Sequence, residues 1–536
     1  MTETQQYLLE MFKEMDYICK KYGIDYYLGG GSLVGAIRHG GFLPWDDDAD
    51  VHMSIENATK FKEAVEKEGL KDRVVYIKSD NGDYMNTHWR YENTASTLLM
   101  RGLTGSKGAQ GQFIDIFLTY PLPLNEKKAQ QCLDDFELYC ELRAQNTTIG
   151  SKRSPEYLKR YFRYKKLEKV MGKKWVIDYL EKKMYHFSQE EAKDWFICAP
   201  FPEKRLVPKA WWGKPRYVKY EDMELPVAEY AEKILSYSYG PAWFELPTYS
   251  ERGEHTFVKD FEIPYSVYTA EYNKYLDIRE FYNQEVEKKE YWFGMMEKRN
   301  KLHPIARRLE GLKVVMEIQD FVERAGIDLR QLVEEKRFEE IAAVFSNYFA
   351  LITTQPFKYW GLYIDLPDDY LYAAAYKYCY DGNYGMAKKL LNGRRNNASS
   401  PLPPEIERLC ELCDATDKLL LALYSDLDYE AAAGLVKEYR AKEPDALYFM
   451  RAEIYLALRG VIEMSDHEIL DRCDQYLAVY PKDGELMKYK GDLIAREGRS
   501  EEADHYYKLA YNNVKNGFCC IWIKRHFEEK GYEDYA

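Results

Sequence analysis

The chain has 536 residues, enough for roughly three to four domains and a large buried core. Hydrophobic residues make up 46% and charged residues 31% of the sequence, and the mean hydropathy is -0.58, which is the balance of a soluble globular protein. The net charge of -13 and the pI of about 5.5 argue against a general nucleic-acid binder, although a local basic pocket for phosphates is compatible with that total.

The ten cysteines are widely spread, without the density of a secreted disulfide scaffold, which favours reduced thiols. Cys410 and Cys413 have no second pair and no nearby His, so we expect a structural role for them. The N-terminal segment is amphipathic and carries acids rather than an apolar signal core, and no run approaches the length of a membrane span. We therefore expect a cytoplasmic protein without a transmembrane segment.

Apolar residues recur at helical spacing from about Thr4 to Lys21, and Gly23 is positioned to end that helix. A strand over 24–28 then leads through three glycines into a short helix over 33–38, for which Ser32 is the expected N-cap. The patterns that follow predict a strand over 48–53, a helix over 56–69, and strands over 73–79, 84–91, 96–101 and 112–118. Together these elements predict a mixed α/β core.

Residues 126–185 are rich in Lys, Glu, Leu and Tyr at helical spacing, which predicts a helical insertion into this core. An α/β-edge segment over 211–227 and a short helix over 228–237 are expected to rejoin it. Residues 266–323 have mainly the pattern of a long charged helix, which predicts a connector between two halves.

From about Asp368 onward, small residues recur at the spacing of paired helices. The same offsets of 0, 7 and 12 occur in two sets: Ala375, Gly382 and Ala387, and Gly491, Gly498 and Ala503. Residues 429–439 and 446–458 fit more loosely, so the sequence predicts three or four degenerate units of a TPR-like solenoid. Such a solenoid either binds a partner or caps and stabilises the first half or a dimer.

The glycines at 29–31 are a candidate anion site. A strand that enters a helix through glycines lets backbone N–H groups approach a phosphate, and the helix N-terminus adds positive potential. Ser32 can add a hydroxyl. The spacing matches neither a Walker A loop nor a dinucleotide fingerprint. A tight turn without a ligand is the alternative interpretation.

Four Asp lie within residues 46–50. Asp48 and Asp50 are two positions apart on the predicted strand, so both carboxylates can face one hard cation such as Mg²⁺ or Mn²⁺, which would bridge phosphate oxygens in phosphoryl transfer. Asp115 stands alone among the apolar residues of a later strand. If the strands are adjacent, Asp115 completes the metal cluster or accepts the proton of an attacking hydroxyl. The alternatives are a solvated acidic turn and a buried, capped Asp115.

These residues resemble the LicD family, which includes the fukutin-related phosphotransferases and has a nucleotidyltransferase-like fold. The family hallmark runs here from Gly29 through Arg38 and Pro44-Trp45 to Asp48 and Asp50. The strand over 113–117 is similar to the family's second acidic strand, and the segment over 224–247 is similar to the motif that closes its domain. The resemblance covers about residues 1–255 and does not extend to the predicted solenoid.

The resemblance implies transfer of a phosphorylated alcohol, such as phosphocholine or ribitol phosphate, from a CDP-linked donor to a sugar hydroxyl of a cell-surface glycan or its precursor, with CMP leaving. It implies Mg²⁺ or Mn²⁺ as the cofactor. The expected catalytic and metal-binding residues are Asp48, Asp50 and Asp115. The expected substrate-binding residues are Gly30, Gly31, Ser32, Arg38, His39 and Trp45. Weaker candidates are Arg90, Arg101 and His255.

The expected architecture is an α/β nucleotidyltransferase-like domain over 1–255 with its helical insertion at 126–185, a helical connector over 256–367 and an all-α TPR-like solenoid over 368–536. The expected partners are the CDP-linked donor, the glycan acceptor, and either a protein partner or a second copy bound through the repeats, with no nucleic acid.

Three alternatives stay open: a nucleotidyltransferase, an Asp-x-Asp glycosyltransferase and a catalytically inactive repeat scaffold. The glycine turn argues against the glycosyltransferase, and the intact acids argue against the inactive scaffold.

Overall fold

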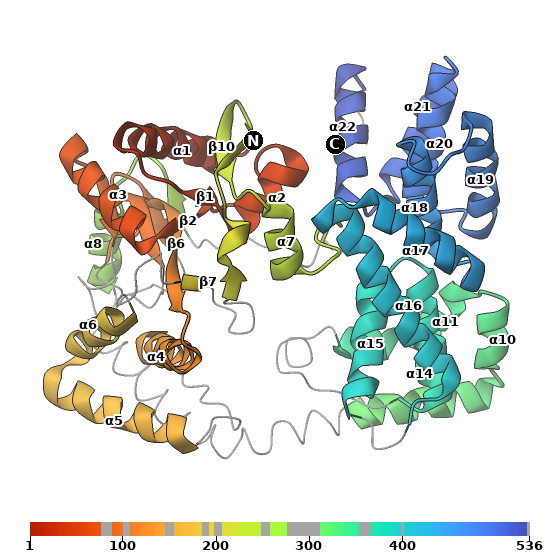
Figure 1. Cartoon of the computed structure of the whole chain (residues 1–536), viewed down its shortest axis with the longest axis horizontal. Coiled ribbons are helices and arrows are strands. Elements are labelled where there is room, and N and C mark those ends of the chain that lie inside the picture. The colour runs from red at the N-terminus through yellow and green to blue at the C-terminus, as the bar shows by residue number, and fades with distance from the viewer. Residues whose placement is uncertain are drawn as a thin grey trace. The chain divides into compact units, whose positions relative to one another are not determined.

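The computed structural model describes residues 1–76, 88–99, 108–144, 155–184, 192–197, 206–247, 258–275, 311–352, 366–397 and 401–532. Its contacts divide the chain into two units (Figure 1), one of Met1–Trp243 with Pro247–Lys289 and one of Phe244–Leu246 with Glu290–Ala536. Domain boundaries at residues 255 and 367 stay a prediction. Arg101, His255 and much of the predicted connector lie outside the described residues.

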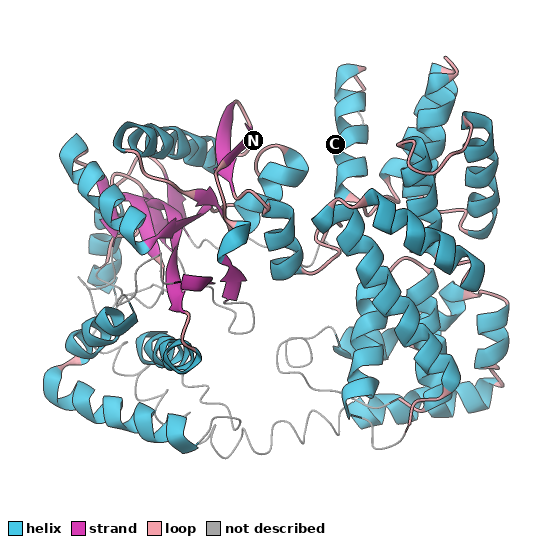
Figure 2. Cartoon of the chain, in the orientation of Figure 1, coloured by secondary structure: helices cyan, strands magenta, loops and turns pink. Residues whose placement is uncertain are grey.

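The first unit is built on a mixed sheet with strand order β1-β2-β6-β4-β3, which β7 and β8 extend from β6 (Figure 2). β2 and β6 run parallel, whereas the other neighbours in this sheet are antiparallel. The strands are β1 (Tyr27–Leu28), β2 (Asp50–Ser54), β3 (Arg73–Tyr76), β4 (Trp89–Asn93), β6 (Gln112–Pro123), β7 (Ala192–Ile197) and β8 (Leu206–Pro208). The predicted mixed α/β core is therefore confirmed, with β6 longer than expected.

The described part of this unit also contains two smaller antiparallel pairs of strands. β9 (Arg216–Tyr220) forms a hairpin with β10 (Met223–Val227), and β5 (Thr97–Leu99) pairs with β11 (Val258–Asp260). Among the described residues of the unit, the α-helices are α1 (Glu3–Tyr22), α2 (Gly30–His39), α3 (Ile55–Glu68), α4 (Glu126–Ala144), α5 (Pro155–Met171), α6 (Lys173–Met184), α7 (Ala231–Tyr239) and α8 (Tyr265–Tyr275). Helices α4–α6 occupy the range in which the sequence predicts helical structure.

Helix α1 begins and ends as its sequence predicts. Thr2 and Gln5 form a capping box at the start, and Gly23, with φ +64°, ends the helix in the left-handed conformation. The apolar stripe that includes Leu8, Phe12 and Met15 is fully buried. Burial of this stripe fixes α1 on the sheet, so its first turn is held in a defined place.

The predicted N-cap role of Ser32 is wrong. Helix α2 begins at Gly30, and Gly29 is its N-cap without a side-chain cap. Gly30 has φ +48°, a value that a residue with a Cβ adopts only at a cost, so the glycines let the chain turn into the helix earlier than the Ser pattern indicates. Ser32 consequently lies inside the first turn of α2, and Gly40, with φ +67°, ends the helix.

The described part of the second unit after Glu290 consists of helices and their connections. A helix covers 311–325. The helices that follow are α10 (Leu329–Glu334), α11 (Phe338–Val344), α12 (Ser346–Ile352), α14 (Asp368–Tyr380), α15 (Tyr384–Asn397), α16 (Pro404–Leu421), a π-helical turn (Ala422–Asp426), α17 (Tyr429–Lys442), α18 (Leu447–Leu458), α19 (Asp466–Val479), α20 (Gly484–Arg496), α21 (Ser500–Tyr511) and α22 (Gly517–Glu529).

The two sets of small residues in the sequence lie at equivalent places in two helix pairs. Gly382 lies in the turn between α14 and α15, and Gly498 lies in the turn between α20 and α21. Their φ values are +80° and +81°. In the second pair, a Cβ on Gly491 would come within 2.6 Å of the Tyr507 ring, so the glycine allows a close approach of the two helices.

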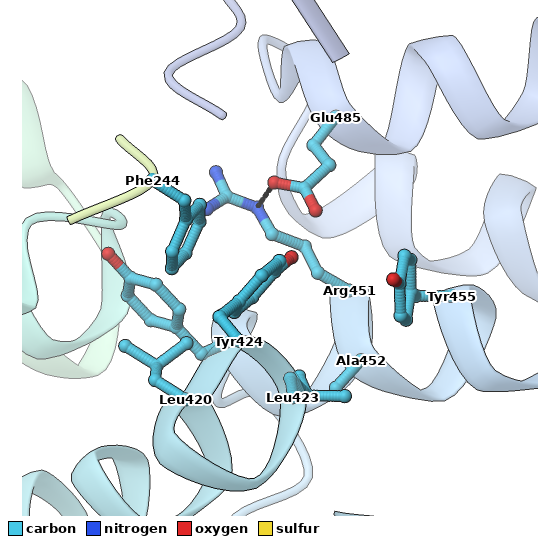
Figure 3. A pocket seen from close by; sticks show the side chains of 9 residues that line it. Phe244, Leu420, Leu423, Tyr424, Arg451, Ala452, Tyr455 and Glu485 are labelled. Atoms are coloured by element: carbon cyan, nitrogen blue, oxygen red, sulfur yellow. Dashed lines mark ion pairs between the residues drawn. The ribbon is translucent and has the colours of Figure 1, made fainter. Parts of the chain in front are cut away.

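Residues Phe244–Leu246 belong to the second unit although their neighbours in sequence belong to the first. The Phe244 ring stacks on Tyr424 with centroids 3.8 Å apart, and the Tyr448 hydroxyl donates to Glu245 Oε1 at 2.7 Å. The backbone N–H of Gly517 donates to Phe244 O at 2.9 Å, and that of Leu246 donates to Lys515 O at 2.8 Å. Figure 3 shows Phe244 lining a small pocket together with Tyr424, Arg451 and Glu485.

None of the helices in the described ranges is both long enough and apolar enough to cross a lipid bilayer.

Candidate active site

Three charged residues form a row across the centre of the sheet. In the parallel register of β2 and β6, Asp50 lies opposite Asp115, and Asp115 in turn lies opposite Arg90 on β4. All three are buried, with exposed fractions of 8%, 7% and 2% respectively. The predicted condition for Asp115 to join the acidic site, adjacency of its strand to that of Asp50, is therefore met.

The glycine turn lies directly against this row. Gly29 N donates to Asp50 O at 2.9 Å, and the N–H of Gly31 donates to the Asp50 carboxylate. A Cβ on Gly30 would lie 2.0 Å from Asp50 Oδ2, and one on Gly31 would lie 2.4 Å from Asp46 Oδ2. The backbone of the glycine turn thus lies against the carboxylates of Asp50 and Asp46. The N-terminus of α2 stabilises negative charge on these two side chains.

The surroundings of Asp50 oppose its ionisation. Burial raises the pKa of Asp50 well above its ordinary value, and the neighbouring carboxylates of Asp48, Asp115 and Asp46 raise it further. The Gly31 N–H acts in the opposite direction but is outweighed. A cation at this place would remove the repulsion and let Asp50 ionise.

Asp115 has the opposite balance. Burial alone would raise the pKa of Asp115, but Arg90 and His88 together hold it below its ordinary value. Arg90 Nε donates to Asp115 Oδ1 at 2.8 Å, and His88 Nε2 lies 3.1 Å from the same oxygen. A carboxylate held ionised in this way is a weak proton acceptor, so the geometry favours an electrostatic role for Asp115 over that of a general base.

The other acids of the run, Asp46, Asp47 and Asp48, differ in burial. Asp47 is buried and forms an ion pair with Lys259 of β11, with Nζ and Oδ2 3.4 Å apart. Asp46 and Asp48 are partly exposed. Asp46 and Asp48 are therefore the acids of the run that are partly open to solvent, whereas Asp50 is buried next to them in the sequence.

The residues present fit a divalent cation in part. Within the described ranges, no group of three or more His, Cys, Asp or Glu is arranged to hold a metal ion. Mg²⁺, however, is commonly held by one or two protein carboxylates, with phosphate and water oxygens completing its shell. Asp48 and Asp50 supply such oxygens, and the repulsion around Asp50 is the electrostatic condition that a cation relieves. Metal binding by Asp48, Asp50 and Asp115 stays a prediction.

The predicted substrate-binding side chains lie at the two ends of α2 and in the loop after it. Ser32 is buried, and its hydroxyl accepts from Asp50 N at 3.0 Å. Arg38 is also buried and donates from Nη1 to Trp243 O at 3.0 Å. His39 and Trp45 are partly exposed, with ring centroids 6.0 Å apart in an edge-on arrangement. Their roles toward a substrate stay predictions.

Sequence reasoning missed Gln5 as a site residue. Gln5 Nε2 donates to Leu43 O at 2.9 Å and to Asp46 O at 3.0 Å, so the first turn of α1 holds both ends of the Pro44-Trp45 loop. Gln5 is 3% exposed. The available signal was the capping box Thr2-x-x-Gln5, which marks the helix start but does not show what else the amide reaches.

Two further residues come from the segment after the insertion. Glu221, in the β9–β10 turn, accepts from Phe42 N at 2.9 Å and donates its own N–H to Gly40 O at 2.8 Å, which fixes the end of α2. Tyr239, at the end of α7, is 54% exposed. Desolvation and, after it, the carboxylates of Asp50, Asp46 and Asp48 raise the pKa of Tyr239, so its hydroxyl is within electrostatic range of the acidic run.

The model of the LicD/FKTN/FKRP nucleotidyltransferase domain matches residues 23–121. The chain carries a LicD-family domain. The matched range contains the glycine turn, the acidic run, Arg90 and Asp115, whereas Gln5, Glu221 and Tyr239 lie outside that range.

Similar proteins share this region with the chain. The lipopolysaccharide cholinephosphotransferase LicD of Haemophilus influenzae is 32% identical over 127 residues, which cover 24% of this chain and 46% of that protein. The ribitol 5-phosphate transferases FKRP of Homo sapiens and Mus musculus are each 35% identical over 75 residues, which cover 13% of this chain and 15% of those proteins. The chain thus spans less than half the length of these curated relatives.

Proposed function

We propose that the protein is a metal-dependent phosphotransferase that moves a phosphorylated alcohol from a CDP-activated donor to a hydroxyl of a glycan. The transferase names of the relatives support the class of reaction, and the acidic run supports the chemistry. Phosphocholine and ribitol phosphate are the two candidate groups, because they are the groups in the names of those relatives.

The observation that carries the proposal is the register of Asp50 and Asp115 beside the glycine turn. A diphosphate donor presents several anionic oxygens, and catalysis of its cleavage depends on positioning and on stabilisation of charge. The site offers carboxylates for a cation, the bare backbone of Gly30 and Gly31 for close approach, and a LicD-family scaffold that holds both rigidly.

In the proposed reaction, the acceptor hydroxyl oxygen forms a bond to the phosphorus that carries the alcohol. The bond from that phosphorus to the bridging oxygen breaks, CMP leaves with the electron pair, and the hydroxyl proton passes to a base or to water. Bound Mg²⁺ or Mn²⁺ would be held by Asp48 and Asp50 and would supply charge neutralisation at the phosphate oxygens. Arg38, His39 and Trp45 are the proposed contacts to the donor, and Asp115 lies opposite Asp50 on the neighbouring strand, paired with Arg90.

We also infer that the helix pairs of the second unit are TPR-like repeats. The equivalent left-handed glycines at Gly382 and Gly498 and the close helix approach at Gly491 support this inference. A glycan acceptor, a protein partner or a second copy is then the candidate ligand of the repeats.

In the test, the full chain is incubated with Mg²⁺ and one donor at a time: CDP-choline, CDP-ribitol or CDP-glycerol. The release of CMP is measured. We expect CMP from one donor in a glycan-stimulated reaction that EDTA stops. Release of pyrophosphate from a nucleoside triphosphate would instead identify a nucleotidyltransferase, and release of a nucleoside diphosphate from a nucleotide sugar would identify a glycosyltransferase. Either result would overturn the proposal, as would donor turnover that EDTA leaves unchanged.

A further inference from the structure

Helices α5 and α6 of the insertion have two different faces. In Figure 1, α5 lies on the side of α4 and α6 that faces away from the sheet. The buried residues of the pair are Tyr157, Tyr161, Tyr164, Val176, Ile177 and Leu180. Contacts to α4 fix this inner face: Arg160 Nη1 donates to Asp134 Oδ2 at 3.1 Å, and the Tyr139 hydroxyl donates to Glu181 Oε1 at 2.6 Å. These hydrogen bonds of the inner face thus do not involve the side chains of the outer face.

The outer face carries large apolar side chains that water surrounds. Five residues are exposed by 40% to 81%: Phe162, Val170, Met171, Trp175 and Tyr179. Three of them gather at the corner between the helices. Val170 and Met171 end α5, Gly172 turns the chain with φ +87°, and Trp175 lies in the first turn of α6. Trp175 stacks on Tyr179 with centroids 5.3 Å apart.

The same two helices are rich in basic residues. Residues 155–184 contain ten Lys or Arg against four Asp or Glu, a net charge of +6 in a chain whose total is -13. The exposed cations of this segment are Lys159, Arg163, Lys166, Lys169, Lys174 and Lys182. The α5–α6 corner is therefore an apolar tip with a cationic rim on an otherwise acidic protein.

We propose that the α5–α6 corner docks onto the surface of a lipid bilayer that contains anionic lipids. Apolar side chains at such a surface enter the boundary between headgroups and acyl chains, and Lys and Arg are attracted to anionic headgroups. Trp and Tyr prefer this interfacial layer. The interface with a protein is a poorer fit, because Lys is depleted from such interfaces, whereas here Lys flanks the apolar tip on both sides. The inference goes beyond the transferase reaction and rests on none of the catalytic residues.

The test is flotation of the full chain with large unilamellar vesicles of pure phosphatidylcholine and with vesicles that contain about 30% phosphatidylglycerol. We expect binding to the anionic vesicles that weakens as NaCl rises from about 0.1 M to about 0.5 M, because salt screens the cationic rim. Binding to the anionic vesicles should exceed binding to neutral ones by at least about fivefold.

Two variants separate the contributions. Val170→Glu with Met171→Glu should reduce binding to anionic vesicles at least about fivefold, since it replaces the apolar tip with charges. Lys166→Glu with Lys169→Glu should remove the preference for anionic over neutral vesicles. The matched control is Leu312→Glu with Met316→Glu, which changes side chains of similar exposure, 48% and 63%, that lie beside acidic Glu317 and should leave binding unchanged.

Wild-type protein that does not bind the anionic vesicles would overturn the proposal, as would unchanged binding by the Val170 and Met171 variant. A change in oligomeric state without lipid, measured by sedimentation velocity and lost in that variant, would assign the corner to a second copy of the chain instead. Far-ultraviolet circular dichroism of each variant shows whether its fold is retained.

Discussion

Asp50 and Asp115 are direct neighbours across the parallel strands β2 and β6, and both are almost completely buried. Two carboxylates so close in a buried place repel each other unless positive charge compensates them. Arg90 and His88 lie beside the Asp115 carboxylate, whereas the group that favours ionisation of Asp50 is the N–H of Gly31. The negative charge of Asp115 is therefore better compensated than that of Asp50. An added cation would be stabilised most by binding beside the Asp50 carboxylate.

Asp48→Ala and Asp50→Ala should each reduce CMP release by about 10²-fold or more, because each removes a carboxylate that would hold the cation. Thermal unfolding should stay cooperative, and the Mn²⁺ affinity measured by electron paramagnetic resonance should fall. Asp222→Ala is the control, because that carboxylate lies in the β9–β10 turn, where it pairs with Lys13 at 2.8 Å. Wild-type turnover by either active-site variant would remove these residues from the mechanism.

Gly30→Ala should be far more damaging than Gly69→Ala. Both glycines have left-handed φ values, +48° and +66°, so each alanine carries a similar backbone cost of about 1–2 kcal/mol. Only at Gly30 would the Cβ meet another group, Asp50 Oδ2, whereas Gly69 has open space within 4 Å. The excess loss of activity and of unfolding free energy in Gly30→Ala therefore measures the crowding of Asp50. Equal losses in the two variants would contradict the close approach.

Arg90→Met should lower the free energy of unfolding by about 3 kcal/mol, because it removes the arginine of a buried ion pair and leaves the Asp115 carboxylate with His88 alone of the two groups that compensate its charge. Urea denaturation measures the effect. Arg216→Met is the matched control: Arg216 also pairs with a carboxylate at 2.8 Å, that of Glu232, but is 42% exposed and should cost less than about 1 kcal/mol. Arg90→Met combined with Asp115→Leu should recover part of the loss, and a purely additive result would exclude the coupling.

Glu92 should make stability depend on pH. Burial raises the pKa of Glu92 to about 7, against the opposing effects of Arg90 and the Gly111 N–H. The folded chain then binds this proton more tightly than the unfolded chain. The associated stability is present below about pH 4.5 and is lost as the pH rises through about 7, a change of about 3 kcal/mol. Glu92→Gln should be more stable than wild type at pH 8 and should flatten this part of the profile, whereas parallel profiles would contradict the shift.

The sequence could predict the elements of the site but not all of the pairings between them. Alternation predicts Asp48, Asp50 and Asp115 on strands, and the register of β2 and β6 makes Asp50 and Asp115 neighbours as expected. The prediction is wrong for Asp48, because β2 begins at Asp50 and Asp48 lies in the loop before it, so the two acids do not share a strand face. From the sequence, Arg90 is a candidate for phosphate binding. The pattern of one strand does not reveal which residue lies opposite Arg90 on the neighbouring strand. The structure shows that this residue is Asp115.

The error at Ser32 has a local cause. The rule that Ser marks a helix start assumes that the residues before it are not helical, but the freedom of Gly30 to adopt φ +48° lets the helix begin before Ser32. The hydroxyl is then available for another group, the N–H of Asp50. Gln5 was missed for a different reason, because its two acceptors lie some 40 positions away in the chain.

The membership of Phe244–Leu246 in the second unit determines where the chain can be divided. Three residues of the helical unit lie within the sequence range of the first unit. A single cut that removes the helical unit therefore separates Phe244 and Glu245 from their partners Tyr424 and Tyr448. The two units are therefore interleaved in the sequence at this one internal segment, which lies within the closing segment over 224–247.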